Sequence, residues 1–153
     1  MYFYSVNVIS IAKCWYQSAY HTPKHMHDYF HLIYIISGKG CLKINNIEYS
    51  LNDEQLYICQ PCCKHEINSD KITPLNTIEV KFSICDDSLY SDFKDIHGSI
   101  NIKLQEVRSI LENTLVEAIG RNYLYRDIIN TNIFSIILKI LKKYSNTRLH
   151  ELM

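Results

Sequence analysis

Short runs of apolar and β-branched residues recur about every ten residues in the first half of the chain. These runs occupy residues 2–20, 25–36, 41–45, 47–51, 55–60, 64–68 and 77–84. Asn45-Asn46 and Asn52-Asp53-Glu54 are typical turn sequences between such runs. About seven or eight short strands at this spacing predict an antiparallel sandwich or barrel.

The segment from His25 to Gly38, HMHDYFHLIYIISG, combines three histidines with an apolar run. If the run is one extended strand, its side chains alternate between two faces. One face then carries His25, His27, Tyr29, His31, Ile33 and Ile35. Both faces become apolar after Asp28, which predicts a strand that is covered on both sides. Gly38 and Gly40 supply the positive φ angles of the tight turn that follows.

The composition describes an ordinary globular domain with balanced charge. The chain has 153 residues, 47% hydrophobic and 21% charged, and its sixteen basic and sixteen acidic residues cancel. A chain without a basic excess is a poor candidate for direct nucleic-acid binding, because phosphate contacts dominate such affinity. Any contact with DNA must therefore come from another segment.

The sequence gives no sign of a membrane span or of export. No apolar run reaches the length of a span, and residues 1–10 have neither a basic leader nor a small-residue cleavage site. We therefore expect a cytoplasmic protein without membrane contact. In that reducing compartment the six cysteines are expected to remain thiols.

The hydrophobic period changes after residue 101 to steps of three and four residues. Leu104–Gly120 predicts an amphipathic helix that Gly120 terminates, and about Tyr125–Tyr144 predicts a second helix. The second helix carries a wide apolar stripe made of Ile129, Ile133, Ile136, Ile137, Ile140 and Leu141. Such a stripe packs on the sheet and the first helix, or additionally on a partner subunit. Residues 146–153 predict the start of a linker.

These features occur in an order that resembles a known family. An H-x-H strand at His25 and His27 is followed by an S-G-x-G turn, an Asn-Asn hairpin, and an apolar strand leading to Pro61 and His65. The strand at 77–84 and the two helices complete the set. Over roughly residues 20–145, this order and spacing resemble the N-terminal effector-binding domain of AraC/XylS-type transcription regulators.

The resemblance implies a mainly β fold. Residues 1–100 would form a cupin-like antiparallel β-barrel of the double-stranded β-helix or jelly-roll type, which binds a small-molecule effector. Residues 101–145 would add two C-terminal α-helices of the same domain, whose apolar stripe forms a homodimer. Residues 146–153 would begin a linker to a helix-turn-helix domain, absent from this sequence, through which the regulator contacts DNA. The chain would then control transcription and would not be an enzyme.

We expect the effector to lie in the barrel interior against His25, His27, His31, His65, Tyr29 and Glu79. Metal-dependent cupins carry H-x-H, a carboxylate three or four residues later, and a histidine from another strand. His25, His27 and His65 match the histidines of that pattern, whereas His31 stands at the carboxylate position. The four histidines are therefore candidate ligands of Zn, Ni, Cu or Fe, since imidazole binds all of these. Alternatively, they hydrogen-bond to backbone, to water or to a polar effector.

Two other functions remain open from the sequence. A stand-alone metal-dependent cupin enzyme, such as a dioxygenase or an isomerase, would use the same histidines. A cupin-like dimerisation module without a ligand would fill its barrel with side chains. Cys59, Cys62 and Cys63 lie just before His65 and could add a thiolate ligand, although a buried free cysteine more often packs as a small hydrophobe.

Overall fold

The computed structural model describes residues 4–152, with side chains as far as Ser145. Its elements are β1 (Val6–Trp15), β2 (Phe30–Ser37), β3 (Gly40–Ile44), β4 (Ile47–Leu51), β5 (Leu56–Cys59), β6 (His65–Ser69), β7 (Asn76–Ile84), α1 (Asp87–Phe93), β8 (Gly98–Ile100), α2 (Leu104–Gly120) and α3 (Tyr125–Leu152). Every run that was predicted to form a strand contains one in the structure. The two predicted helices begin at the predicted residues, Leu104 and Tyr125. The three-residue β8 was not predicted, because so short a segment carries no periodic pattern.

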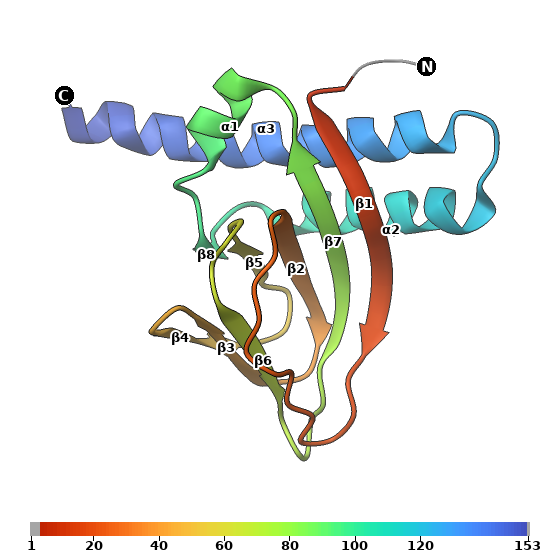
Figure 1. The fold of residues 1–153 in the computed structure, drawn as a ribbon, viewed down its shortest axis with the longest axis vertical. Helices are drawn as coiled ribbons and strands as arrows, with labels where there is room; N and C mark the ends of the chain where they lie inside the picture. The colour runs from red at the N-terminus through yellow and green to blue at the C-terminus, as the bar shows by residue number, and fades with distance from the viewer. Residues whose placement is uncertain (1–3, 153) are drawn as a thin grey trace.

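Two antiparallel sheets face each other and form the barrel (Figure 1). The larger sheet has the strand order β1-β7-β2-β5-β8, and the smaller has the order β4-β3-β6. The helices α2 and α3 lie side by side and cross the strands at one end of the larger sheet, as Figure 1 shows. The predicted cupin-like barrel followed by two helices is therefore confirmed.

The central strand β2 is buried on both faces, as its alternation predicts. The even-numbered residues from Phe30 to Tyr34 belong to the core that the larger sheet shares with the helices, where Val107 also lies. The odd-numbered Ile33 and Ile35 belong to a second core between the two sheets. Full burial of one such side chain contributes about 1.5–3 kcal/mol. This register turns His31 toward the space between the sheets.

The apolar stripe of α3 packs within the chain itself. Four of its members are fully buried, Ile129 is 6% exposed and Leu141 is partly buried; the four are Ile133, Ile136, Ile137 and Ile140. The prediction that these residues form the dimer interface is therefore wrong for the five isoleucines, because the larger sheet and α2 already cover them; for the partly buried Leu141 it stays a prediction. A partner subunit would have to use other residues.

The helix α3 is longer than predicted. It continues to Leu152 instead of ending near Tyr144, since residues 145–152 contain no Gly or Pro that would stop it. The segment 146–152, predicted as the start of a linker, is thus helical, and Met153 lies outside the described residues. Neither α3 nor any other helix in the described part of the chain combines the length and apolarity needed to cross a membrane.

The turn after β2 depends on Gly38. Its φ of 94° lies in the region that side chains avoid, and a Cβ atom there would collide with the backbone carbonyl of Pro74. A Gly38→Ala change should lower the free energy of unfolding by about 1–3 kcal/mol in a denaturant titration. The matched control is Gly120→Ala, which has helical geometry and room for a methyl group and should be neutral or stabilising. Equal stability of the two variants would contradict this account.

Candidate metal centre

The histidines reach the barrel interior from three segments. The strand β2 begins at Phe30, so the prediction of one continuous strand from His25 is wrong. The cause is that the His25 backbone pairs with His65 of the smaller sheet through two N–H···O bonds of 3.1 and 2.8 Å. The chain then crosses to the larger sheet, with His27 in the crossing segment and His31 on β2.

Three of these residues form what we call the histidine cluster: His25, His27 and His65. One ring nitrogen of each lies within 4.8 Å of the other two. Their ring centroids are 4.4–5.0 Å apart. His31 is farther away, with its centroid 5.8 Å from that of His65 and 6.1 Å from that of His27. The structure thus brings together three of the four predicted metal ligands and leaves His31 outside the set.

Backbone carbonyls determine which nitrogen carries the proton in two cluster residues. A carbonyl oxygen can only accept, so Nδ1–H of His25 donates to Pro23 (2.6 Å) and Nδ1–H of His65 donates to Cys63 (3.0 Å). In the neutral rings the lone pair then lies on Nε2. Metal-binding histidines usually show this arrangement, with the second nitrogen held by a carbonyl or carboxylate.

Three imidazole nitrogens in this region are buried without a hydrogen-bond partner among the described residues. They are His27 Nε2, His65 Nε2 and His31 Nδ1. Because buried polar atoms are nearly always paired, such a group indicates an ion, a ligand or ordered water. The chemistry of the donors fits a divalent transition metal ion, which the three imidazoles of the histidine cluster would hold.

Burial keeps His27 and His65 in the neutral form that a metal requires. Burial, together with the nearby His25, His31 and His27, lowers the pKa of His65 to about 4, although its hydrogen bond to Cys63 opposes this shift. Burial, followed by the influence of His25 and His31, also lowers the pKa of His27. Both rings are therefore neutral near pH 7, so metal binding there needs no deprotonation.

A buried hydrogen-bonded network adjoins the histidine cluster. His31 Nε2–H donates to Glu79 Oε2 at 2.8 Å, while Tyr16 and Thr77 hydroxyls donate to Glu79 Oε1 at 2.5 and 2.9 Å. Burial alone would raise the pKa of Glu79, but its hydrogen bonds to His31 and to the two hydroxyl groups lower it to about 2. Both carboxylate oxygens are thus occupied by the protein, and His31 is held with its Nδ1 directed away from Glu79.

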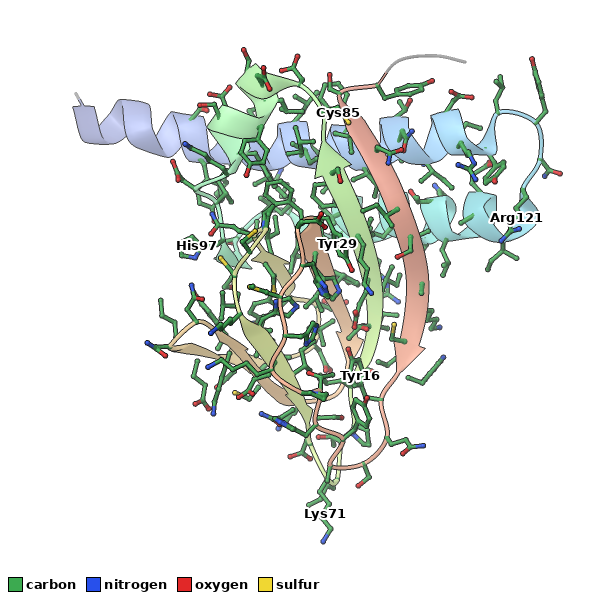
Figure 2. The ribbon with its side chains drawn as sticks, in the orientation of Figure 1. Tyr16, Tyr29, Lys71, Cys85, His97 and Arg121 are labelled. Atoms are coloured by element: carbon green, nitrogen blue, oxygen red, sulfur yellow. The ribbon has the colours of Figure 1, made fainter. Side chains whose placement is uncertain are left out.

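The sequence analysis did not single out Tyr16 and Thr77. Tyr16 was one of twelve tyrosines, and only the pairing of β1 with β7, in which Trp15 lies opposite Asn76, brings it near Glu79. Thr77 shares a face with Glu79 by simple alternation, which was the available signal. The predicted contact residue Tyr29 stacks on His27, with centroids 4.5 Å apart and rings inclined by 7°. Figure 2 shows Tyr29 nearer the helices and Tyr16 nearer the opposite end of the barrel.

The cysteines near His65 do not join the cluster among the described residues. Cys59 is buried, Cys62 is exposed and Cys63 is partly buried. Burial raises the pKa of the Cys59 thiol to about 12, so the thiol stays protonated at neutral pH. Cys59 is therefore the small buried hydrophobe that the sequence analysis gave as one alternative.

Comparison with known proteins gives one family match. The family model for the AraC-like ligand binding domain matches residues 8–117. No curated protein sequence matches the chain.

Solved structures with a similar arrangement share little sequence with this chain. A conserved protein of unknown function from Streptococcus pyogenes has a TM-score of 0.44 at 14% identity, and the match covers 48% of this chain and 62% of that one. A predicted oxalate decarboxylase from Thermotoga maritima has a TM-score of 0.48 at 18% identity, with 51% and 69% covered. A cupin protein from Bacteroides fragilis has a TM-score of 0.44 at 20% identity, with 50% and 66% covered.

Proposed function

Because this chain belongs to the family of AraC-like ligand binding domains, we propose that it is the effector-sensing module of an AraC-type transcription regulator. The observation that carries the proposal is the group of three buried imidazole nitrogens, on His27, His31 and His65, that lack hydrogen-bond partners among the described residues. A ligand held by the histidine cluster would pair with two of them, His27 Nε2 and His65 Nε2, and so relieve the free-energy cost of leaving buried polar groups unsatisfied. The free energy of the barrel is therefore lower with such a ligand bound at these nitrogens than without it.

The ligand best suited to this site is a divalent transition metal ion. Apolar side chains such as Ile33, Leu42 and Tyr57 fill the second core between the sheets, which favours an ion or a small polar molecule over a larger effector. The histidine cluster would hold Zn, Ni, Cu or Fe. When bound, the ion links the smaller sheet, which carries His65, to the segment that leads into β2.

The hydrogen-bonded network offers a path from the site to the helices. His31 bonds to Glu79, Glu79 accepts from Tyr16, and Tyr16 directly follows β1. At the other end of β1, the Val8 N–H donates to the Asn130 side chain of α3 at 2.9 Å. A ligand that repositions His31 would thus bias how β1 meets α3, which is the kind of contiguous coupling that a sensor needs.

The experiment that tests this role is hydrogen–deuterium exchange of the chain with and without Zn²⁺. The sensor proposal expects changes in two regions, the histidine cluster and the remote amides of β1 and α3. Protection confined to the residues around the cluster would contradict the sensor proposal.

The same experiment separates the second candidate function, a stand-alone metal-dependent cupin enzyme. That alternative is favoured by the size of the cluster, because three protein ligands leave a coordination position open, as catalytic metal sites do. A metal that serves catalysis needs no coupling to α3. Exchange that changes only near His25, His27 and His65 would therefore favour the enzyme over the sensor.

The regulator proposal includes a homodimer and a DNA-binding segment outside this sequence. With the α3 stripe buried, the exposed apolar residues Val116 and Ile119 on one face of α2 are the better candidates for the dimer contact; they are 67% and 76% exposed. Since the chain's charges balance, its DNA contacts would come from that other segment.

We expect a Val116→Glu/Ile119→Glu double variant to be monomeric in sedimentation velocity at micromolar concentration, because buried charges at an apolar contact are strongly unfavourable. The matched control is Ile72→Glu, at a position that is 87% exposed outside the helices, and this variant should remain dimeric. A wild-type chain that sediments as a monomer, or a double variant that still dimerises, would contradict the assignment.

A further inference from the structure

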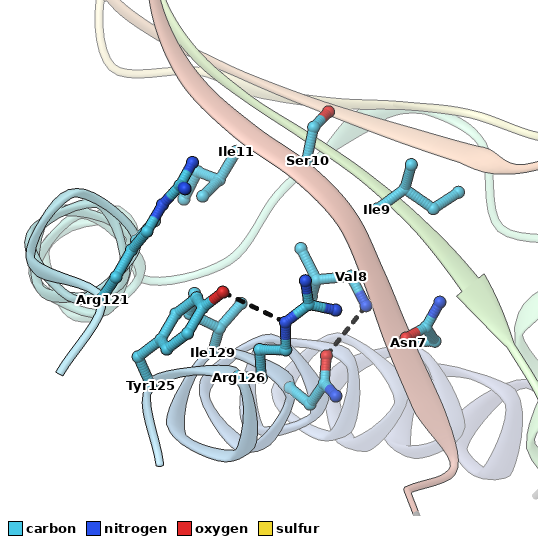
Figure 3. Close-up of a pocket in the computed structure, with 11 residues that line it drawn as sticks. Asn7, Val8, Ile9, Ser10, Ile11, Arg121, Tyr125, Arg126 and Ile129 are labelled. Atoms are coloured by element: carbon cyan, nitrogen blue, oxygen red, sulfur yellow. Dashed lines mark hydrogen bonds between the residues drawn. The ribbon is translucent and has the colours of Figure 1, made fainter. Parts of the chain in front are cut away.

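A cavity lies away from the histidine cluster, between β1 and the junction of α2 with α3 (Figure 3). Its volume is about 330 Å³, which is within the range of small-molecule sites. The strand β1 forms one wall with residues 7–11, and the helices contribute Arg121, Tyr125, Arg126 and Asn130. Figure 3 shows both arginine side chains reaching from the helices toward β1.

The cavity carries positive charge that the protein does not neutralise. No Asp or Glu is among its lining residues. In the part of the chain that the structure describes, neither Arg121 nor Arg126 forms an ion pair with a carboxylate. By contrast, Arg108 on α2 pairs with both Glu112 and Glu54.

The polar groups around the two arginines are arranged as donors. Asn130 Oδ1 accepts from the Val8 N–H at 2.9 Å, so its amide N–H groups remain available. The Tyr125 hydroxyl oxygen accepts from Arg126 Nε at 3.1 Å, so its own proton can be given to a ligand. The terminal N–H groups of Arg126 are then free to form a two-pronged bond with an oxyanion.

Arg121 reaches the cavity at a cost in backbone energy. It caps the C-terminus of α2 in the left-handed conformation, with φ of 49°, a position at which glycine is usual. Gly120 directly precedes it and keeps helical geometry. An arginine is less favourable than a glycine in this conformation, because its Cβ approaches the following carbonyl oxygen.

We propose that this cavity binds the oxyanion of a small ligand, either a phosphate or a carboxylate group. Two guanidinium groups, a phenol and an amide line the cavity from α3 and the C-terminal cap of α2, while Ile9, Ile11 and Ile129 offer apolar surface for the rest of the ligand. The site bridges β1 and the helices, so its occupation would stabilise their contact. This inference stands independently of the proposed function, because it uses none of the histidines.

The test measures binding of inorganic phosphate and of succinate to the metal-free chain by calorimetry and by the shift in thermal unfolding temperature. Saturable binding of at least one anion is expected, and the tighter of the two identifies the phosphate or the carboxylate class. An Arg121→Gln/Arg126→Gln double variant should bind at least about tenfold more weakly while keeping its circular dichroism spectrum. Arg108→Gln is the matched control and should bind as wild type does.

Two further arms make the outcome decisive. The double arginine variant should bind Zn²⁺ as wild type does, which separates this cavity from the histidine cluster. Sodium chloride at matched ionic strength should give no saturable stabilisation, since simple screening has no specific site. Undiminished anion binding in the double arginine variant, weaker Zn²⁺ binding in that variant than in wild type, equal stabilisation by chloride, or no binding of either anion would each overturn the proposal.

Discussion

Replacing His65 by alanine is expected to weaken the binding of Zn²⁺ or Ni²⁺ at least about 100-fold. His65 contributes one of three imidazole nitrogens that lie within 4.8 Å of one another, and its Nδ1–H is already committed to the Cys63 carbonyl. Without the His65 ring, the remaining ligands are His25 and His27, which both lie on the segment before β2, and no strand of the smaller sheet contributes a ligand. Calorimetric titration, or competition with a coloured chelator, measures the change.

The matched control for this prediction is His97→Ala. His97 is exposed, and Figure 2 shows it at the outer edge of the molecule. That variant should bind metal as wild type does, whereas His27→Ala should show the same loss as His65→Ala. Equal weakening in the His97 variant, or no weakening in either cluster variant, would show that the metal binds elsewhere.

Replacing Glu79 by alanine is expected to lower the free energy of unfolding by about 3–5 kcal/mol. The carboxylate is 8% exposed and accepts hydrogen bonds from His31, Tyr16 and Thr77. Without it, the buried His31 and Thr77 and the partly buried Tyr16 lose their acceptor. Urea titration measures the loss. The matched control is Glu106→Ala, whose exposed ion pair with Lys139 should contribute no more than about 1 kcal/mol.

The same residue makes a distinct contribution to pH dependence. The pKa of Glu79 is lowered from its ordinary 4.5 to about 2. The folded chain therefore takes up a proton on this group at a lower pH than the unfolded chain does. The stabilisation is therefore fully present above about pH 4.5 and is lost as the pH falls from 4.5 toward 2. Across that window, the Glu79→Ala variant should lose less stability than wild type. Parallel stability profiles would contradict this assignment.

The architecture could be predicted from the sequence because short apolar runs alternate with turn residues in the first half of the chain. In the second half, apolar residues recur at the three- and four-residue spacing of helices. Each strand run from Val6 to Ile84 and both helix starts were found in the structure. Periodicity reports which residues are buried, but it does not report what covers them. The α3 stripe was therefore identified correctly as apolar and assigned wrongly to a partner subunit, since the larger sheet and α2 cover it.

The candidate histidines can be named from the sequence, but the contacts that each of them makes cannot. The alternation of side chains along a strand predicted that His25, His27 and His31 share one face. The resemblance to the order of motifs in a known family added His65. The division of roles between them depends on tertiary pairing. His25 bonds to the His65 backbone, and Glu79 holds His31. Neither partner is close in sequence, and no local pattern reveals them.

The most direct test of the account is X-ray absorption at the metal edge of the chain loaded with one equivalent of Zn²⁺ or Ni²⁺. We expect the first coordination shell to contain three imidazole nitrogens at about 2.0–2.1 Å for Zn²⁺ and no sulfur, and the spectrum to change in His65→Ala. A sulfur-containing shell, a spectrum without imidazole scattering, or a chain that takes up no metal would contradict the proposal that His25, His27 and His65 form a metal-binding effector site.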